Sequence, residues 1–397
     1  MRCRICNSEN IEKIYNIAHY PITSGPVVAN SAKKVKSDNV SIGFCFNCGS
    51  CTLIEPDPEK IHYDGSYTSS NMAVTLGAKV DSKMKAFMKL INTLGLKKNS
   101  KVLEIGCYDG SLMRYMNDRL KFDVYGCEPC SYIANIAIKK YAFRIQKKYF
   151  SSNLYKHTLF DAVVFRYVLE HIPYPIRFLC DVRRVLSSEG VIIFEIPNGE
   201  FRVKNSILGS IVPEHPGYFG MNSIRMVLKA SGFRDIKLKS YKGRIIAKAK
   251  KGKKHKLIKQ EQRQIDTLYK SLKAGARRSL EKYQEIRSTT KGMSNFYLFG
   301  ANTCTLELLA TGSINSKQVN WVIDDGPLKW NKKIVNFGIP VKSRESIKDI
   351  KGEKTVVICS YYSHEKLFNF LRTELTPPFK ILRLYPNIEI VQREATK

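Results

Sequence analysis

A glutamate and a histidine stand side by side in the stretch IVPEHPGYFG, residues 211–220 of a 397-residue chain that has only seven histidines. The prolines and glycines of this stretch disfavour a helix or a central strand, so we expect Glu214 and His215 on a loop. An imidazole with an unperturbed pKa of about 6.5 can take up an acidic proton without much tuning. The pair is therefore a candidate general base beside a carboxylate, and an ordinary solvent-exposed polar pair is the alternative.

A second group of reactive side chains lies near the amino terminus, where Cys3 and Cys6 form one CxxC pair and Cys45 and Cys48 form another. Four thiolates in this pattern are typical of a closed, tetrahedral structural zinc site. The chain has eleven cysteines, an odd number, which favours reduced thiols and a metal site over disulfides. We expect structural Zn²⁺, with Cys51 as a competing fifth ligand and a redox dithiol as the alternative.

The segment KVLEIGCYDGSLMRYM predicts a buried strand with Glu104 near its end, a turn containing Gly106 and Gly110, and then a helix. Such glycine turns let the backbone approach a ligand at the carboxyl end of a strand. The next strand ends at Glu128, where an acidic side chain can accept both hydroxyls of a ribose. The turn lacks the G-x-G-x-x-G spacing that cradles a pyrophosphate, which favours S-adenosylmethionine over NAD.

Strands and helices alternate from Lys101 to about Lys250 and again from Asn295, which predicts two α/β units with parallel sheets. Between them, apolar residues at helical spacing predict one long amphipathic helix. These residues are Leu257, Ile265, Leu268, Leu272, Ala276, Leu280, Tyr283 and Ile286. We expect an α/β protein with a zinc-binding lobe at 1–75, a cofactor-binding domain at 76–252, a linking helix at 253–290 and a smaller α/β domain at 291–397.

The formal net charge of +31 is spread over the whole chain as lysines, and no arginine-rich or aromatic-interleaved stripe stands out. A lysine-biased genome explains this charge better than a polyanionic partner, so we expect no nucleic-acid partner. No apolar run approaches the length that crosses a bilayer, and the first ten residues lack the apolar core of a signal peptide. We therefore expect no membrane partner and a cytoplasmic location.

The order of motifs over about 150 residues resembles the class I S-adenosylmethionine-dependent methyltransferases, which have a Rossmann-like sheet. After the two acidic strand ends come FDAVVFRYVLEHIPYP, GVIIFEIPN and a final antiparallel pair of strands. The resemblance implies that Glu104 helps to orient the methionine amino group and that Glu128 binds the ribose. It also places Gly106, Tyr108, Gly110 and Tyr167 at the cofactor.

The flanking segments extend this resemblance to the sugar C-methyltransferases, which act on nucleotide-diphosphate-linked keto-deoxysugars. The matching features are the CxxC lobe, Tyr67, Ser69 and Ser70 in DGSYTSS, His171, the Glu214–His215 loop with Tyr218 and Phe219, and a carboxyl-terminal α/β unit. The resemblance implies that His215 removes a proton beside a ketone, and that His171 or Tyr67 steadies the enolate. Tyr108 replaces the asparagine of that family's first-strand loop. Two further departures are Val212 and Tyr167, which stand where the family commonly has tyrosine and asparagine.

Several alternatives stay open at this point. His171 could simply pack near the cofactor, and Tyr67 could be an ordered contact. Gly300, Asp324 and Asp325 could contact a nucleotide or serve only as scaffold. The chain could also be a sugar O- or N-methyltransferase, a zinc-bearing RNA methyltransferase or a non-catalytic binding protein. We expect a monomer or a weak homo-oligomer, and the sequence leaves the sugar, the methylated carbon and the nucleotide carrier open.

Overall fold

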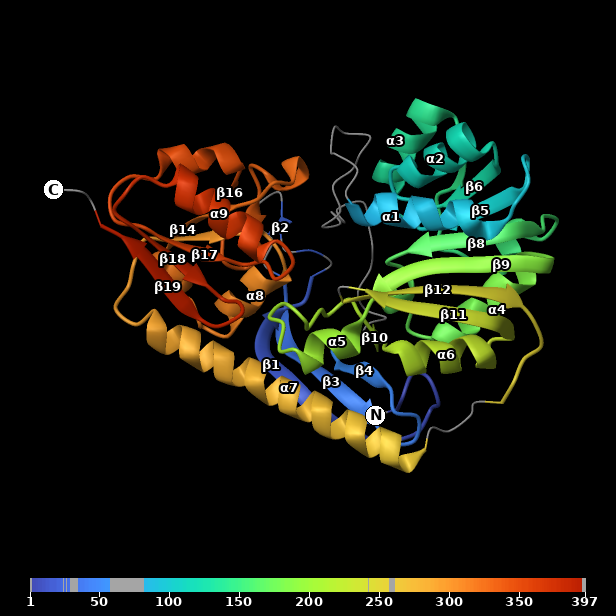
Figure 1. Ribbon diagram of the computed structural model, residues 1–397, viewed down its shortest axis with the longest axis horizontal. Helices are drawn as coiled ribbons and strands as arrows, with labels where there is room; N and C mark the ends of the chain where they lie inside the picture. Colours follow the sequence, from blue (N-terminus) through green and yellow to red (C-terminus); the bar gives the residue numbers. More distant parts are fainter. Residues whose placement is uncertain are drawn as a thin grey trace.

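The computed structural model describes residues 2–23, 25, 27–28, 35–57, 82–241, 243–256 and 261–394. In this part the chain forms sheets of four, seven and six strands and a two-stranded ribbon (Figure 1). The ribbon pairs β2 (Val27–Val28) with β15 (Lys333–Ile334) and so joins segments near the two ends of the sequence. None of the helices in the described ranges is both long and apolar enough to cross a bilayer.

The amino-terminal sheet is antiparallel, and its strand order is β1-β3-β4-β10. Its strands are β1 (Ile11–Pro21), β3 (Ser37–Cys45), β4 (Cys51–Glu55) and β10 (Gly217–Tyr218). The last strand comes from the loop that carries Glu214 and His215, since Gly217 pairs with Thr52 and Tyr218 with Cys51. The loop predicted from its prolines and glycines is thus held at its end by a short edge strand.

The central sheet has the order β11-β12-β9-β8-β5-β6-β7, in which β5 to β9 are parallel and β12 runs antiparallel to both of its neighbours. The predicted parallel sheet and final antiparallel pair are confirmed. The strands are β5 (Lys101–Ile105), β6 (Asp123–Cys127), β7 (Arg144–Gln146), β8 (Phe160–Arg166), β9 (Leu186–Pro197), β11 (Phe233–Tyr241) and β12 (Arg244–Lys251).

Helices cover both faces of this sheet. Its helices are α1 (Ser82–Ile91), α2 (Ser111–Leu120), α3 (Ser131–Tyr141), α4 (Pro175–Val185), α5 (Gly199–Lys204) and α6 (Met221–Ala230). The apolar residues of α4 and α6 share one core with the sheet, and those of α1 and α2 share another. The fold is therefore the Rossmann-like arrangement expected from the sequence.

The carboxyl-terminal sheet has the order β16-β14-β13-β17-β18-β19 and is parallel except for β19. Its strands are β13 (Phe296–Phe299), β14 (Val319–Ile323), β16 (Val341–Lys342), β17 (Thr355–Ile358), β18 (Phe379–Arg383) and β19 (Glu389–Arg393). Helices α8 (Thr303–Ala310) and α9 (His364–Glu374) belong to this unit. The second α/β unit is confirmed, whereas the bounds of the four predicted segments stay predictions.

The long helix α7 (Gln262–Thr289) lies along the amino-terminal sheet and the carboxyl-terminal unit (Figure 1). Most of the predicted apolar positions are buried, but Leu280 is 41% exposed, so its assignment to the packed face is wrong. At 100° per residue Leu280 lies about 80° from the direction of Leu272, whereas Tyr283 lies about 20° from it. Leu257 lies outside the described residues.

One apolar core joins the amino-terminal sheet, α7 and the carboxyl-terminal unit. It includes Tyr15, Tyr20 and Phe44 from the first sheet, Leu208, Ile211 and Tyr218 from the loop region, Leu272 and Tyr283 from α7, and Leu298 and Val357 from the last sheet. Polar contacts follow the same path, since the Tyr269 hydroxyl donates to Glu12 at 2.5 Å and the Tyr15 and Tyr283 hydroxyls lie 3.2 Å apart. The loop region is therefore packed between elements that are distant in sequence.

Gly275 in the middle of α7 provides a test of this packing. A Cβ at this position would lie 2.2 Å from the carbonyl oxygen of Val203, a backbone atom that cannot swing aside. Gly275→Ala should therefore lower the free energy of unfolding by about 2 kcal/mol, although the same change in an isolated helix stabilises it by about 1 kcal/mol. Denaturant unfolding followed by circular dichroism measures the difference.

The matched control is Ser271→Ala, at an exposed position of the same helix. It should stabilise the protein by a few tenths of a kcal/mol through helix propensity alone. Equal stabilisation by both substitutions would contradict the close approach of α7 to α5.

Candidate functional site

The order of the strands in the central sheet reverses at β5, which pairs with β6 on one side and β8 on the other. Open α/β sheets bind ligands at the carboxyl ends of the strands beside such a reversal. Here that edge carries the end of β5 with Glu104, the following turn, and the segment after β8 with Tyr167 and His171. The edge is the candidate cofactor site.

Close backbone packing shapes the turn after β5. Gly106 and Gly110 have φ values of +68° and +72°, and Tyr108 has a φ of 48°. A Cβ on Gly106 would lie 2.8 Å from a Val168 methyl carbon, so glycine is required for the approach of these two segments. The turn therefore needs glycine at this position, and its role in cofactor binding stays a prediction.

Two buried carboxylates lie at this edge. Glu128 accepts hydrogen bonds from the backbone amides of Tyr108 at 3.0 Å and Cys130 at 2.8 Å, and burial raises the pKa of its carboxyl. One oxygen of the buried Glu104 has no hydrogen-bond partner. The pKa of the Glu104 carboxyl lies well above its usual value, mainly because of burial and to a smaller extent because of the negative charge of Asp109. An acceptor left unpaired next to a glycine turn fits the amino group of a bound amino-acid moiety.

Tyr167 follows β8 with a φ of 55°, a conformation that is costly for a tyrosine and easier for an asparagine. Its hydroxyl donates to Glu195 at 3.3 Å. Glu195 is fully buried on β9, and Arg166 and Arg244 pair with its two oxygens. Sequence reasoning missed this charged cluster, although a glutamate inside the apolar run VIIFEIP was a signal of a buried partner.

His171 and His215 meet at the same edge, with ring centroids 4.6 Å apart and planes at 80°. The Nδ1 atom of His171 lies 3.0 Å from the backbone carbonyl oxygen of Glu214. Burial lowers the pKa of His171 to about 4, and burial, His171 and Arg202 lower that of His215 well below its ordinary value. Both rings are therefore neutral at neutral pH.

The tautomer of His171 follows from this contact. A carbonyl oxygen can only accept, so Nδ1 of a neutral His171 carries the proton and Nε2 can only accept. The predicted role of His171 as an enolate donor does not fit this tautomer. Tyr67, the other predicted donor, lies outside the described residues, as do Ser69 and Ser70.

Glu214 contacts His171 through its backbone carbonyl. Burial raises the pKa of its carboxyl to about 8. Between these two described residues, no hydrogen bond links the Glu214 carboxylate to the His215 ring. The carbonyl of Glu214 instead holds His171, which fixes the position of the neighbouring His215.

The loop that carries His215 is anchored by side chains from the carboxyl-terminal unit. Glu307 on α8 accepts the backbone amides of Gly209 and Ile211, the second at 2.9 Å, and the Tyr283 hydroxyl. Thr303 donates to the Gly209 carbonyl at 3.0 Å, and the Tyr385 hydroxyl accepts from the Leu208 amide at 2.6 Å. Sequence reasoning missed Glu307, although a carboxylate in the apolar helix TLELLA was a signal.

The loop is also closed on itself. The Tyr218 hydroxyl accepts from the backbone amide of Val212 at 2.9 Å and donates to its carbonyl at 3.1 Å. Val212, which replaces a tyrosine of the resembling family, is buried. Its backbone is therefore fixed whatever side chain it carries.

The four predicted zinc ligands lie together. The sulfur atoms of Cys3 and Cys48 are 3.6 Å apart, as are those of Cys6 and Cys45, and all four lie within 4.8 Å of one another. Tetrahedral zinc with bonds of about 2.3 Å separates its sulfur ligands by about 3.8 Å, so this cluster fits the ion. Cys51 is buried in β4 within the core and is not part of the cluster, so a fifth ligand is not needed.

The corresponding edge of the carboxyl-terminal sheet is filled by the chain itself. Asp324 accepts from the amides of Ala301 and Gly326, each at 2.8 Å, and pairs with the buried Lys329 at 3.1 Å. Asp325 pairs with Arg344. These contacts favour a scaffold over a nucleotide site at this edge.

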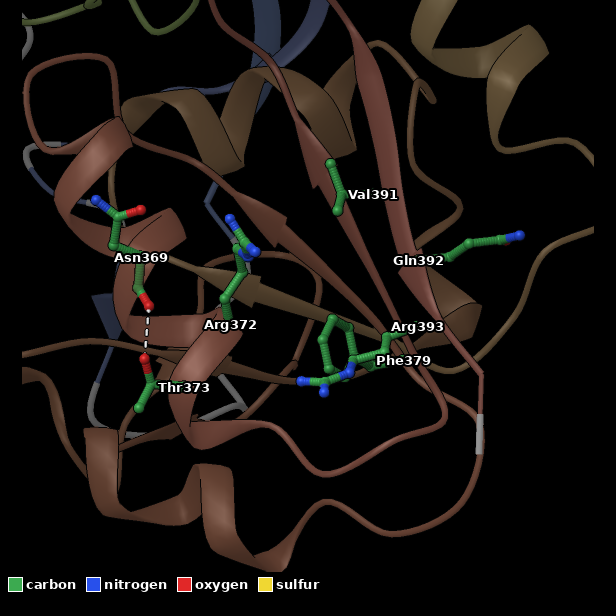
Figure 2. Close-up of a pocket in the computed structure, with 7 residues that line it drawn as sticks. All are labelled: Asn369, Arg372, Thr373, Phe379, Val391, Gln392 and Arg393. Atoms are coloured by element: carbon green, nitrogen blue, oxygen red, sulfur yellow. Dashed lines mark hydrogen bonds between the residues drawn. The ribbon is translucent and has the colours of Figure 1, made fainter. Parts of the chain in front are cut away.

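A cavity of about 470 Å³ lies between α9 and the β18–β19 edge (Figure 2). It is lined by Asn369, Arg372, Thr373, Phe379, Val391, Gln392 and Arg393. Phe379 begins β18 and pairs with Arg393, so the cavity lies at the amino end of a parallel strand. Because ligands of open α/β sheets bind at the carboxyl ends, this cavity is not the candidate active site.

Comparison with known proteins agrees with the geometry of the central sheet. Residues 79–238 match the family model of a methyltransferase domain. The search of curated proteins finds no match. Most of the central sheet thus belongs to a methyltransferase domain, and the protein is a methyltransferase enzyme.

Solved structures resemble this part of the chain at low identity. The CurJ carbon methyltransferase has a TM-score of 0.36 at 15% identity, over 45% of this chain and 57% of that chain. An S-adenosylmethionine-dependent methyltransferase from Archaeoglobus fulgidus has a TM-score of 0.34 at 15% identity, over 42% and 92%. The plantazolicin methyltransferase BpumL in complex with SAH has a TM-score of 0.34 at 15% identity, over 43% and 82%.

Replacing Glu307 tests whether the carboxyl-terminal unit holds the loop. Glu307→Ala leaves two backbone amides and one hydroxyl without their acceptor in a buried place, so the free energy of unfolding should fall by about 3 kcal/mol. The control Glu285→Ala removes an exposed carboxylate of α7 and should change it by less than about 0.5 kcal/mol. Denaturant midpoints measure both, and equal stability of the two variants would contradict the anchoring role.

Proposed function

We propose that this methyltransferase transfers a methyl group to carbon in a nucleotide-diphosphate-linked keto-deoxysugar, with His215 as the base. The observation that carries the proposal is the pair of neutral imidazoles at the cofactor edge, one locked by a carbonyl and the other beside it. Carbon methylation beside a ketone needs an unprotonated base that removes the acidic α-proton from carbon. Methylation of oxygen or nitrogen does not involve removal of a carbon-bound proton.

The fit of S-adenosylmethionine rests on the two carboxylates of the edge. Glu104 offers its unpaired oxygen to the amino group, and Glu128 offers the remaining lone pairs of its oxygens to the ribose hydroxyls. Gly106, Tyr108 and Gly110 form the turn beneath them. When bound, the cofactor supplies an electrophilic methyl group on a sulfonium.

His215 then removes the α-proton of the sugar ketone onto its unprotonated ring nitrogen. The C–H electron pair becomes the enolate that forms the new carbon–carbon bond, and the proton stays on His215 until solvent takes it. Burial makes the imidazolium costly, which speeds its return to the neutral form. His171 acts as a positioning residue through the Glu214 carbonyl, and the enolate donor is assigned to Tyr67.

The substrate class is supported by the parts that surround the central sheet. The CxxC lobe, the anchored Glu–His loop and the carboxyl-terminal unit occur together in the family that the sequence resembles. Support for an active rather than a merely binding protein comes from Val212, since Tyr218 fixes the backbone of the loop where the family tyrosine is missing.

The test is proton exchange and methyl transfer on a panel of nucleotide-linked 4-keto sugars, followed by mass spectrometry in D₂O. Wild type should exchange the α-proton and gain one methyl group with loss of one carbon-bound hydrogen. His215→Asn should slow the exchange by about 10²-fold or more. The control His157→Asn changes an exposed histidine and should leave the rate unchanged.

Two results would count against the assignment. Exchange at the wild-type rate in His215→Asn would remove this residue from the base role. A gained methyl group with full retention of the α-hydrogen would indicate O- or N-methylation instead.

We also propose that Cys3, Cys6, Cys45 and Cys48 bind one structural Zn²⁺. Further support comes from N–H groups that point at the sulfurs, since the Ile5 amide lies 3.5 Å from Cys3 and the Asn47 side-chain nitrogen 3.4 Å from Cys6. Cys3, Cys45 and Cys48 also pack against the core of the central sheet, so the lobe and the catalytic domain share apolar surface.

Removal of this ion should loosen the amino-terminal lobe. Elemental analysis should find one zinc per chain, and Cys48→Ser should lose it together with cooperative unfolding of the lobe. Cys51→Ala is the matched control, because Cys51 is buried close by in sequence but lies outside the cluster, and its zinc content should stay at one. Zinc retention by Cys48→Ser would overturn the site.

A further inference from the structure

We propose that Glu170, His171 and His215 form a binding site for a divalent transition-metal ion of the Zn²⁺ or Co²⁺ type. One carboxylate oxygen and one nitrogen from each ring lie within 4.8 Å of one another. The site itself is independent of the proposed reaction. Its consequence, that a bound ion blocks His215 as a base, rests on the proposed function.

Glu170 provides the first argument. It lies in a short 3₁₀ turn, Leu169–His171, and is only 1% exposed. One of its carboxylate oxygens is buried and has no hydrogen-bond partner. A buried carboxylate needs a paired charge, hydrogen bonds or a metal ion to offset its loss of hydration. No described side chain supplies the first two to this oxygen, and burial raises the pKa of the Glu170 carboxyl well above its ordinary value, so a cation that binds here takes the place of a proton.

The orientation of His171 provides the second argument. Histidines that bind metals almost always donate their other ring N–H to a carbonyl or carboxylate, which fixes the ring and its tautomer. His171 makes this contact, with Nδ1 3.0 Å from the Glu214 carbonyl oxygen. Its Nε2 atom therefore carries the lone pair that a metal ion requires.

The donor set indicates the type of ion. Two imidazoles and one carboxylate suit Zn²⁺, Co²⁺ or Fe²⁺, whereas Mg²⁺ and Ca²⁺ prefer oxygen ligands alone. Three protein ligands leave a fourth position for water. His171 and His215 are half-buried as residues, so the site is not sealed from solvent. Bonds of about 2.0–2.2 Å separate such ligands by about 3.4 Å, and the present separations are at most 4.8 Å, so the side chains would have to close by at most about 1.4 Å.

Neighbouring charges act in both directions. Glu195 and Glu214 lie close enough to Glu170 to raise the pKa of its carboxyl. Glu195 is already paired with Arg166 and Arg244, and burial raises the pKa of the Glu214 carboxyl to about 8, so both add little attraction for a cation. The positive charge of Arg202 lowers the pKa of His215 and also repels a cation bound to that ring. We therefore expect a modest affinity for the metal ion, which increases when a further ligand occupies its fourth coordination position. The four-cysteine cluster, in contrast, should hold its zinc permanently.

Occupation of the site and proton removal exclude each other. The lone pair that His215 would use for the α-proton is the one that binds the ion. A bound transition metal should therefore stop the reaction reversibly, without any change to the cofactor edge at Glu104 and Glu128.

The experiment titrates Co²⁺ into the full-length protein with Zn²⁺ already in the four-cysteine cluster. One further equivalent should bind and give weak visible d–d bands, without the sulfur-to-cobalt charge-transfer bands of thiolate ligands. Glu170→Gln keeps the shape of the side chain and removes its charge, so the affinity should fall at least about 10-fold. Glu189→Gln, an exposed carboxylate paired with Arg234, is the control and should bind as wild type does.

A second measurement needs no variant. In histidine-labelled wild type, Co²⁺ should broaden the ring resonances of His171 and His215 by paramagnetic relaxation and leave that of the exposed His157 sharp. Absence of the extra equivalent, unchanged binding by Glu170→Gln, or broadening of other histidines would overturn the site.

The effect on activity separates the two proposals. If wild type exchanges the α-proton, that exchange should disappear with the same Co²⁺ midpoint as the spectral change and return on addition of EDTA. If exchange persists with the site filled, the competition with the base is overturned. If wild type shows no exchange at all, the proposed function fails, and the spectra still decide whether the metal site exists.

Discussion

The Glu307 carboxylate, buried between the carboxyl-terminal unit and the loop before His215, is the contact on which the arrangement of the site depends. It accepts two backbone amides of the loop and the hydroxyl of Tyr283 from α7. The loop has no regular structure of its own, so its buried amides need acceptors from elsewhere. The amino-terminal sheet pairs with its far end at Tyr218. Three parts of the chain thus converge on one loop, which the central sheet alone could not hold in place.

This burial also sets the chemistry. Removing the loop from water keeps His171 and His215 neutral and raises the pKa of the Glu214 carboxyl, because each charged form would lose hydration. The neutral form carries the lone pair that proton removal requires, although the lowered pKa also makes His215 a weaker base. One oxygen of the buried Glu170 carboxyl likewise has no hydrogen-bond partner. The conditions that favour a base and those that favour a metal ion therefore arise from one cause, and His215 belongs to both arrangements.

Local patterns in the sequence predicted those features that depend on neighbouring residues. Apolar runs gave the parallel strands, strand ends gave Glu104 and Glu128, and paired CxxC motifs gave the four-cysteine cluster. Features that depend on distant partners could not be predicted. Glu307 meets Gly209 across 98 positions, and the tautomer of His171 depends on the carbonyl of Glu214, 43 positions away. The amino-terminal sheet was missed for a related reason, since its fourth strand, β10, comes from the central part of the chain.

The carboxyl-terminal unit shows why a second α/β sheet need not carry a second active site. At the edge where such a sheet would bind a ligand, Asp324 already accepts two backbone amides and the Lys329 ammonium. A ligand would have to displace these buried contacts, and each lost hydrogen bond to a charged group costs about 1.5–3 kcal/mol. The adjacent helix α8 instead offers Thr303 and Glu307 to the neighbouring loop. This unit therefore acts as a structural support through the surface that contacts the central domain. That surface determines where His215 lies.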